Sequence, residues 1–336
     1  MHATTTDLTA NAATIDRTTD YRRVRPADPP DGAGPRTDSP DEGRAAATAY
    51  ADTTVAVVVP AYNEADRVGE VLDSIPPFVD RIYAVDDAST DDTWAEIRAR
   101  VPSGSGPHGD DVDGRILPIR HEENQGAGGA LRTGYLTALD EGIDVTVTMD
   151  ADGQMDPELM SALVDPVADG RADYAKGNRL ADPEDRRGMP PFRRFGNWLL
   201  TYLTKIASGY WGVMDPQNGY TAISGDALAA VDVESLPDGH DYPNDLLVRL
   251  QVADKSVADV AMPAVYDDEE STIDYAEFVP TTSLTLLRGF CRRIGHALSP
   301  GNADPRTAIR GALVGITVVT WIALSRRDDA EGRGEE

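Results

Sequence analysis

The chain has 336 residues and a formal net charge of −27, so it can form one large domain or two small ones. Its single cysteine, Cys291, excludes a disulfide framework and a CxxC metal motif. The acidity excludes nonspecific nucleic-acid binding, because neutralising phosphate requires clustered positive charge. Only three of the 31 basic residues are lysines, and an acidic, lysine-poor surface indicates a protein that must stay soluble in concentrated salt.

Residues 1–52 are rich in Thr, Asp, Ala, Pro and Gly and contain almost no large apolar side chains. Such a segment cannot bury enough surface to offset the entropy lost on ordering, so we predict a disordered, acidic N-terminal tail. It contains no apolar stretch typical of a signal peptide, and this predicts a cytoplasmic location.

From residue 55 onward, strand patterns alternate with helix patterns. Buried strands are predicted at 55–59, 82–85, 116–119 and 145–149, helices at 64–74, 91–100 and 126–139, and a Gly, Pro and Asp-rich loop at 102–114. This alternation predicts a doubly wound α/β fold, in which ligands bind beyond the carboxyl ends of the strands.

The fourth predicted strand is followed by Asp-Ala-Asp-Gly-Gln at 150–154. In extended backbone, residues two apart project to the same side, so Asp150, Asp152 and Gln154 are expected to converge. Oxygen ligands suit Mg²⁺ or Mn²⁺, which proteins usually hold with one or two carboxylates plus substrate phosphates. An ordinary Asp/Gly turn would explain this segment equally well if it stood alone.

Two other strand ends carry polar residues at the same predicted edge. The first strand leads into Pro-Ala-Tyr-Asn-Glu at 60–64, and the absence of GxGxxG there argues against a dinucleotide site. The second leads into the Asp-rich segment 86–93, where a carboxylate can accept hydrogen bonds from a nucleobase or ribose. Together, the three strand ends favour a site for a metal-bound nucleoside diphosphate.

In these motifs the chain resembles the inverting GT-A glycosyltransferases of family 2, and among them the dolichol-phosphate mannose and glucose synthases. The resemblance covers roughly residues 53–300. The motifs that carry it are residues 57–64, 85–93, 124–134, 149–157, 176–179 and 215–220.

The resemblance implies a role for each matching residue. The nucleotide would contact Pro60, Tyr62, Glu64, Asp86, Asp87 and Asp150. The metal and diphosphate would be held by Asp150, Asp152 and Gln154. The residues implied in catalysis are Asp152, Arg179 and Gln217, with Arg193, Arg194 and Asp215 near the acceptor or phosphate.

Two positions depart from the family pattern. Ala127 stands in the glycine-rich loop where the family commonly has Lys, and residues 266–273 are acidic where the synthases often carry basic residues. The charge that binds an acceptor phosphate would then have to come from Arg179, Arg288 or Arg292.

The implied reaction moves mannose or glucose from GDP-mannose or UDP-glucose to dolichol or polyprenyl phosphate, with inversion, for protein glycosylation. A phosphate acceptor needs no general base, because its second pKa is about 6. None of the five histidines is required for catalysis, and they are expected to face solvent: His2, His108, His121, His240 and His296.

The C-terminal part reverses the charge pattern of the chain. Residues 276–327 contain seven Arg against Glu277 and Asp304. We predict a basic amphipathic helix at 276–300 that contacts a membrane surface, after a catalytic domain at 53–275. A hydrophobic segment at 307–326 follows, with a polar tail at 327–336; its apolar run is shorter than the roughly 20 residues that a membrane span needs. The alternative is a C-terminal helix packed on the domain.

Two further functions remain open from the sequence. A family 2 transferase could glycosylate a hydroxyl of a lipid-linked or polymeric glycan, with a carboxylate base from 241–245 or 267–270. The chain could also bind a sugar nucleotide without catalysis.

Overall fold

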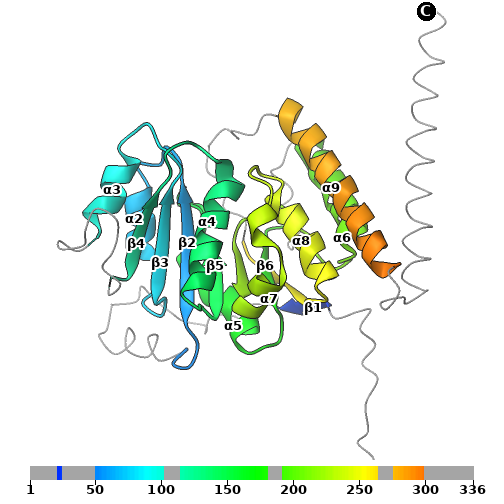
Figure 1. Cartoon of the computed structure of the whole chain (residues 1–336), viewed down its shortest axis with the longest axis horizontal. Helices are drawn as coiled ribbons and strands as arrows, with labels where there is room; N and C mark the ends of the chain where they lie inside the picture. Colours follow the sequence, from blue (N-terminus) through cyan, green and yellow to red (C-terminus); the bar gives the residue numbers. More distant parts are fainter. Residues whose placement is uncertain (1–20, 25–49, 102–113, 181–190, 264–274, 299–336) are drawn as a thin grey trace, which may run out of the picture.

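A computed structural model describes residues 21–24, 50–101, 114–180, 191–263 and 275–298. Within them, eight strands form one sheet in the order β1-β8-β6-β7-β5-β2-β3-β4 (Figure 1). The strands are β1 (Tyr21–Val24), β2 (Val55–Ala61), β3 (Arg81–Asp86), β4 (Ile116–Arg120), β5 (Val145–Thr148), β6 (Tyr174–Asn178), β7 (Thr221–Ser224) and β8 (Val257–Ala261).

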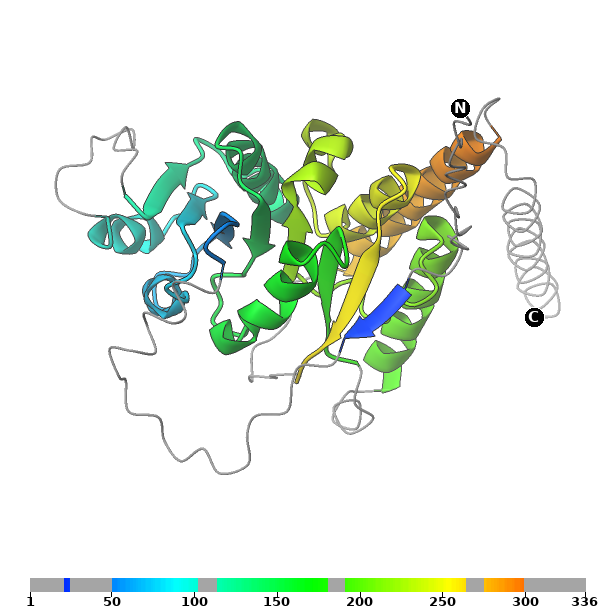
Figure 2. The ribbon, with the colours of Figure 1, turned by 90° about the horizontal axis from the view of Figure 1, so that it is seen from below.

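The helices cover both faces of this sheet (Figure 2), as a three-layer α/β architecture requires. They are α2 (Val68–Ser74), α3 (Thr93–Ala99), α4 (Gly126–Asp140), α5 (Met160–Ala168), α6 (Pro191–Ser208), α7 (Gly225–Ala230), α8 (Tyr242–Val252) and α9 (Tyr275–Ala297), with short 3₁₀ turns at Pro157–Leu159 and Val233–Ser235. One hydrophobic core joins α2, α3 and α5 to the sheet, and a second joins α4, α7 and α8 to the other face.

The four predicted strands and three predicted helices in residues 55–149 are confirmed, with shifted ends. The helix expected from residue 64 begins at Val68, because residues 65–67 form a turn. The wound sheet is mixed and not all parallel: β7 runs antiparallel to both β5 and β6. The expected loop at 102–114 lies almost entirely outside the described residues.

The N-terminal expectation is wrong for Tyr21–Val24, which form the edge strand β1 and pair in parallel with β8. Pairing at a sheet edge uses backbone hydrogen bonds, so it does not require the large apolar side chains that the segment lacks. The rest of the predicted tail lies outside the described residues.

A helix in the predicted basic C-terminal segment is confirmed as α9. Leu286 and Phe290 of α9 pack against Val248 of α8 and Ala207 of α6. In the part of the chain that the structure describes, no helix is long and apolar enough to cross a membrane. The hydrophobic segment predicted at 307–326 and the polar tail lie outside the described residues.

Helix α4 lies unusually close to β2. A Cβ atom added at Gly134 would stand 2.3 Å from Cγ1 of Val58, which is itself completely buried. Only glycine permits this approach, which brings the beginning of α4 to the carboxyl end of β2.

Gly134→Ala is therefore expected to lower the free energy of unfolding by about 2 kcal/mol, because the new methyl group overpacks the core. Gly295→Ala is the matched control, since nothing lies within 4 Å of its added Cβ on α9. Denaturant unfolding in molar KCl measures both variants. Equal stability of the two would contradict the close packing of α4 on β2.

Candidate active site

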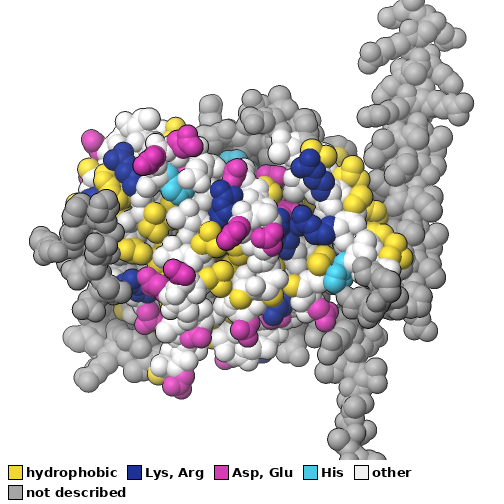
Figure 3. Space-filling model, viewed as in Figure 1, with side chains coloured by type: hydrophobic (Ala, Val, Ile, Leu, Met, Phe, Trp, Pro, Cys, Tyr) yellow, Lys and Arg dark blue, Asp and Glu magenta, His cyan; other side chains and the backbone are white. Residues whose placement is uncertain are grey.

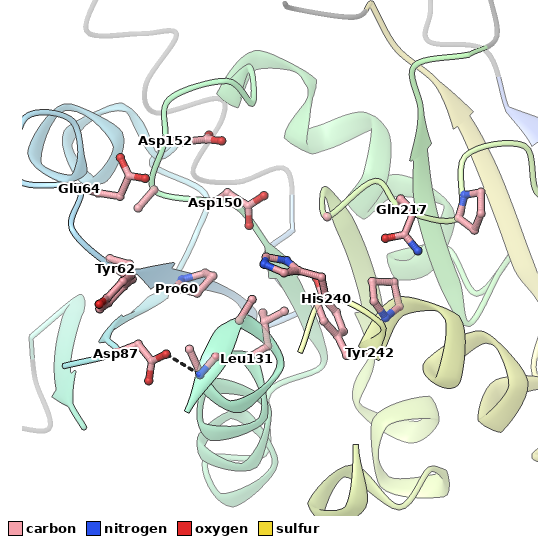
Figure 4. Close-up of a pocket in the computed structure, with 18 of the residues that line it drawn as sticks. Pro60, Tyr62, Glu64, Asp87, Leu131, Asp150, Asp152, Gln217, His240 and Tyr242 are labelled. Atoms are coloured by element: carbon pink, nitrogen blue, oxygen red, sulfur yellow. Dashed lines mark hydrogen bonds between the residues drawn. The ribbon is translucent and has the colours of Figure 1, made fainter. Parts of the chain in front are cut away.

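A cavity of about 550 Å³ lies beyond the carboxyl ends of β2 and β5 (Figure 4). One side is formed by the segments that follow β2 and β5 and by the beginning of α4. The other side is formed by α6, the segment before β7 and the beginning of α8. The lining side chains include Pro60, Tyr62, Glu64, Asp87, Ala127, Leu131, Asp150, Asp152, Arg179, Leu200, Thr201, Asp215, Gln217, His240 and Tyr242.

Most residues that the sequence predicted for the site line this cavity. Gln154 does not; it borders a smaller cavity of about 110 Å³ that shares Asp150, Asp152, Arg179 and Gln217 with the larger one. Asp86 lines neither cavity. Arg193 and Arg194 belong to the first turn of α6, but the structure does not describe their side chains, so their phosphate-binding role stays a prediction.

The acidic segment after β5 forms a turn and not an extension of the strand. β5 ends at Thr148, and Gly153 has a positive φ of 74°. Oδ1 of Asp152 accepts a hydrogen bond from the Gln154 amide at 2.9 Å, and Nη1 of Arg67 donates to the Asp152 carbonyl at 2.9 Å. The expected two-residue alternation is therefore wrong beyond Asp150, although both aspartates still reach the cavity.

Asp150 is half-buried in the cavity wall, in an unfavourable environment for a carboxylate. Burial, followed by the nearby charge of Asp152, raises the pKa of Asp150 to about 7. Arg179 and Lys176 act in the opposite direction but do not compensate. A divalent cation beside both aspartates would supply the missing positive charge.

This raised pKa predicts how stability depends on pH. Because the folded-state pKa of Asp150 lies above its ordinary value of 3.8, its contribution is greatest below that value and is lost as pH rises through about 7. Without metal, Asp150→Asn is expected to be nearly neutral at pH 4 and to stabilise the protein by ~4 kcal/mol at pH 8. Denaturant unfolding at the two pH values, with chelator present, tests this difference. A constant offset between variant and parent would contradict it.

The donor set fits a Mg²⁺ or Mn²⁺ ion held jointly with phosphates. The cavity lining contains five carboxylates but, among the described residues, Arg179 is its one Arg or Lys. A diphosphate would be repelled by this surface unless a cation accompanied it. No group of three or more His, Cys, Asp or Glu side chains gathers into a metal cage within the described ranges, so the remaining ligands would have to be phosphate oxygens and water.

Arg179 is held at the cavity wall by Asp215. Its Nε donates to Asp215 Oδ2 at 2.9 Å, and its Nη2 to Oδ1 at 3.4 Å. Asp215 is buried, whereas the Arg179 side chain is 40% exposed. Of the three arginines suggested for the acceptor phosphate, Arg179 lines the cavity, and Arg288 and Arg292 do not.

A buried lysine supports the turn on which Gln217 lies. Lys176 of β6 is completely buried and donates a hydrogen bond to the carbonyl of Asn218. Burial lowers the pKa of its ammonium to about 8, against the opposing effect of Asp215. The sequence offered one signal for this role, because lysine is rare elsewhere in the chain.

The two aspartates at the end of β3 have different surroundings. Asp86 is buried, with Arg120 Nε 3.0 Å from its Oδ2, and its Oδ1 accepts a hydrogen bond from the Ser89 amide. Asp87 binds the beginning of α4: its two oxygens accept hydrogen bonds from the amides of Gln125 and Gly126 at 2.9 and 2.8 Å. The carboxylate at the cavity edge is therefore Asp87, not Asp86.

The expectation that the histidines face solvent is wrong for His121. Its side chain is buried, with Nδ1 2.7 Å from Asp87 Oδ1 and Nε2 2.9 Å from Thr133 Oγ1. Since an ionised carboxylate only accepts hydrogen bonds, Nδ1 must donate to Asp87. His121 thus joins the cavity edge to the body of α4.

His240 is exposed, as predicted, but it also lines the cavity, which the sequence reasoning did not anticipate. His296 is exposed, as predicted, and His2 and His108 lie outside the described residues. The cavity is also lined by three residues that belong to no recognisable sequence motif: Leu200, Thr201 and Tyr242. They come from helices whose position on the sheet a local pattern cannot give.

Comparison with known proteins places this site in a family. Residues 56–231 match the family described as Glycosyl transferase family 2. The chain is 28% identical over 222 residues to UDP-N-acetylglucosamine–dolichyl-phosphate N-acetylglucosaminyltransferase of Methanococcus voltae, covering 65% of this chain and 88% of that protein. It is 28% identical to undecaprenyl-phosphate mannosyltransferase of Micrococcus luteus, covering 63% and 83%.

A further relative and a solved structure extend the likeness. Glycosyltransferase AglD of Haloferax volcanii is 31% identical over 302 residues, 85% of this chain and 43% of that protein. Glucosyl-3-phosphoglycerate synthase from Mycobacterium tuberculosis, solved with UDP, superimposes with a TM-score of 0.54 at 22% identity, covering 76% and 86%. That likeness shows a shared GT-A-like α/β fold. The match over more than half of its length shows that the chain belongs to glycosyl transferase family 2.

Proposed function

We propose that this chain transfers a hexose from a nucleoside diphosphate sugar to a polyprenyl phosphate such as dolichyl phosphate, with inversion at the anomeric carbon. The relatives from Methanococcus voltae and Micrococcus luteus carry names of transferases for dolichyl and undecaprenyl phosphate. The glucosyl-3-phosphoglycerate synthase was solved with Mn²⁺ and UDP, which supports a divalent cation beside the aspartates here.

The observation that carries the proposal is that the described carboxylates near the α6 side of the cavity already have partners within the protein, so none of them is available as a base. Asp215 is engaged by Arg179 there. The base candidates at 241–245 do not line the cavity: Asp241 accepts a hydrogen bond from Thr285 at 2.5 Å, and Asp245 is paired with Arg249 and Arg292. The other candidates, at 267–270, lie outside the described residues.

An acceptor that is already an anion fits this arrangement. A phosphate monoester is largely ionised at neutral pH, so it can attack without losing a proton to the protein. Its oxygen would form a bond to the anomeric carbon while the bond from that carbon to the leaving diphosphate oxygen breaks. A hydroxyl acceptor would need a base, and no observation favours that alternative.

The described residues have distinct tasks in this reaction. Pro60, Tyr62 and Asp87 lie at the end of the cavity where the nucleoside would bind (Figure 4). Asp150 and Asp152 would hold a Mg²⁺ or Mn²⁺ ion, which neutralises the leaving diphosphate when bound. Arg179 would bind phosphate oxygens, for which a guanidinium offers a planar fork of donors.

The proposal also covers where in the cell the reaction takes place. A polyprenyl phosphate resides in a bilayer, so the enzyme would work at the cytoplasmic surface of a membrane and supply glycosylation of proteins. The helix α9 supports this placement, because it contains three Arg and one acidic residue in an otherwise acidic chain.

A labelling experiment tests the function. Purified protein in molar KCl with Mg²⁺ or Mn²⁺ and dolichyl phosphate receives labelled GDP-mannose, UDP-glucose or UDP-N-acetylglucosamine in turn. We expect label from one donor to enter an organic-extractable, acid-labile lipid, and chelator to abolish the transfer. Slow donor hydrolysis without any labelled lipid would retain the metal site and reject the acceptor.

A further inference from the structure

Two helices at one end of the molecule are positively charged, although the whole protein is strongly negative. α6 and α9 have 18 and 23 residues, and together contain six Lys or Arg but one acidic residue, Glu277. In the complete chain, about one residue in six is Asp or Glu. The two helices lie side by side (Figures 1 and 2), and Arg293 of α9 donates to the carbonyls of Ile206 and Ala207 at the end of α6.

Three large aromatic side chains are exposed at this end, on α6 and the segment after it. Trp198, Tyr202 and Trp211 are 60%, 44% and 55% exposed. Trp198 stacks on Tyr202 with ring centroids 5.9 Å apart, and Trp211 meets Tyr202 edge-on at 6.3 Å. We call these three residues the aromatic ledge. Contact between the rings fixes their arrangement but leaves most of the two indole surfaces in water, an unfavourable state for a soluble surface.

The neighbouring helix adds apolar and basic side chains. Leu284 and Leu287 of α9 are 46% and 59% exposed, beside the exposed Arg288. Figure 3 shows hydrophobic side chains gathered along α9 with Lys or Arg next to them. Trp and Tyr rings, apolar side chains and arginines occur together on protein surfaces that enter the boundary between lipid headgroups and acyl chains.

The aromatic ledge shares helix α6 with the lining of the active-site cavity. Leu200 and Thr201 of α6 line the cavity, and Tyr202 is the next residue of the same helix. A molecule that extended from the cavity around α6 would therefore approach the aromatic ledge. An isoprenoid chain attached to a bound phosphate has the length and the apolar character for this path.

We propose that the aromatic ledge inserts into the interfacial region of an anionic lipid bilayer, with the exposed Arg288 of α9 toward the headgroups, and thereby places the cavity beside the membrane surface. This inference rests on the proposed lipid-borne acceptor. Charge complementarity favours the occupant: an acidic chain that presents a positive, aromatic end will orient that end toward anionic lipid. Molar salt screens the attraction between charges, so apolar insertion of the aromatic ledge carries the binding there.

Tryptophan fluorescence of the full chain tests the proposal. A reporter with Trp94→Phe and Trp321→Phe retains only Trp198 and Trp211, and is mixed with vesicles of anionic phospholipid that carry brominated acyl chains. A matched protein with Trp198→Phe, Trp211→Phe and Trp321→Phe retains only Trp94, on α3 at the other end of the molecule. We expect a blue shift and strong quenching for the first protein and neither change for the second.

Vesicle flotation completes the test. Trp198→Ser, Tyr202→Ser and Trp211→Ser together should lower the ratio of vesicle-bound to unbound protein by roughly tenfold or more, whereas Leu136→Ser on α4 should not. Unquenched emission from the aromatic ledge, or equal quenching of Trp94, would overturn the proposal and leave a protein partner as the occupant.

A further experiment distinguishes a failure of this inference from a failure of the proposed function. Transfer to a short, water-soluble polyprenyl phosphate in detergent requires the active site but no bilayer. If that transfer occurs while the aromatic ledge stays unquenched, only the present inference fails. If the aromatic ledge is quenched but no lipid phosphate receives sugar, the inference about the surface holds and the proposed function fails.

Discussion

Asp152→Asn is expected to lower kcat/KM for sugar transfer by about 10³-fold, the largest effect of any conservative change in this chain. The substitution removes one of the two carboxylates beside the proposed metal and diphosphate. It keeps the local fold, because an Asn side chain can still accept the hydrogen bond that Asp152 Oδ1 receives from the Gln154 amide. Loss of activity would therefore report on charge and metal binding, not on a collapsed turn.

The matched control is Asp156→Asn. Asp156 lies four residues away on an exposed part of the same segment, and its Oδ1 accepts a hydrogen bond from the Glu158 amide. Initial rates at several Mn²⁺ concentrations measure both variants, and calorimetry measures the affinity for the nucleoside diphosphate. We expect Asp156→Asn to behave like the parent. An Asp152→Asn protein with parental activity and unchanged metal dependence would remove this residue from the site.

Arg179→Gln is expected to lower kcat/KM by about 10²-fold, because the guanidinium proposed to bind phosphate oxygens is lost. The same change also leaves the buried carboxylate of Asp215 without its partner, so a loss of stability is expected as well. The single variant cannot separate these two effects.

The double variant Arg179→Gln, Asp215→Asn separates them. Removing both charges should restore stability, since no buried carboxylate remains unpaired. If Arg179 binds phosphate, activity stays low in the double variant. Recovery of activity together with stability would show that Arg179 serves only to balance Asp215. Thermal unfolding measures stability and initial rates measure activity on the same preparations. Arg179→Lys serves as an additional variant that keeps the charge but loses the bidentate fork.

The sequence was most informative where structure is local. A continuous apolar run at Val55–Val59 predicted β2, and alternating apolar residues at Val145–Met149 predicted β5, because a strand in a sheet must be apolar on its buried faces. Ligands bind at the carboxyl ends of strands in such sheets, so we expected Tyr62 and Asp150 to line one cavity. The structure confirms this.

Features that depend on long-range pairing could not be predicted in this way. The direction of β7 is set by its neighbours β5 and β6, and β1 exists only because β8 offers an open edge. His121 illustrates the same limit for the site. Its burial between Asp87 and Thr133 follows from how β4 and α4 pack, and its sequence neighbours Glu122 and Glu123 are exposed.

The central claim is that the acceptor brings its own anionic nucleophile, and a matched pair of acceptors tests it most directly. Polyprenyl phosphate and the corresponding polyprenol, of equal chain length in the same detergent, are offered with the donor that supports labelling. The account predicts transfer to the phosphate and at least 100-fold slower transfer to the alcohol, because Asp215, the cavity carboxylate on the α6 side among the described residues, is engaged by Arg179. Comparable or faster transfer to the alcohol would contradict it.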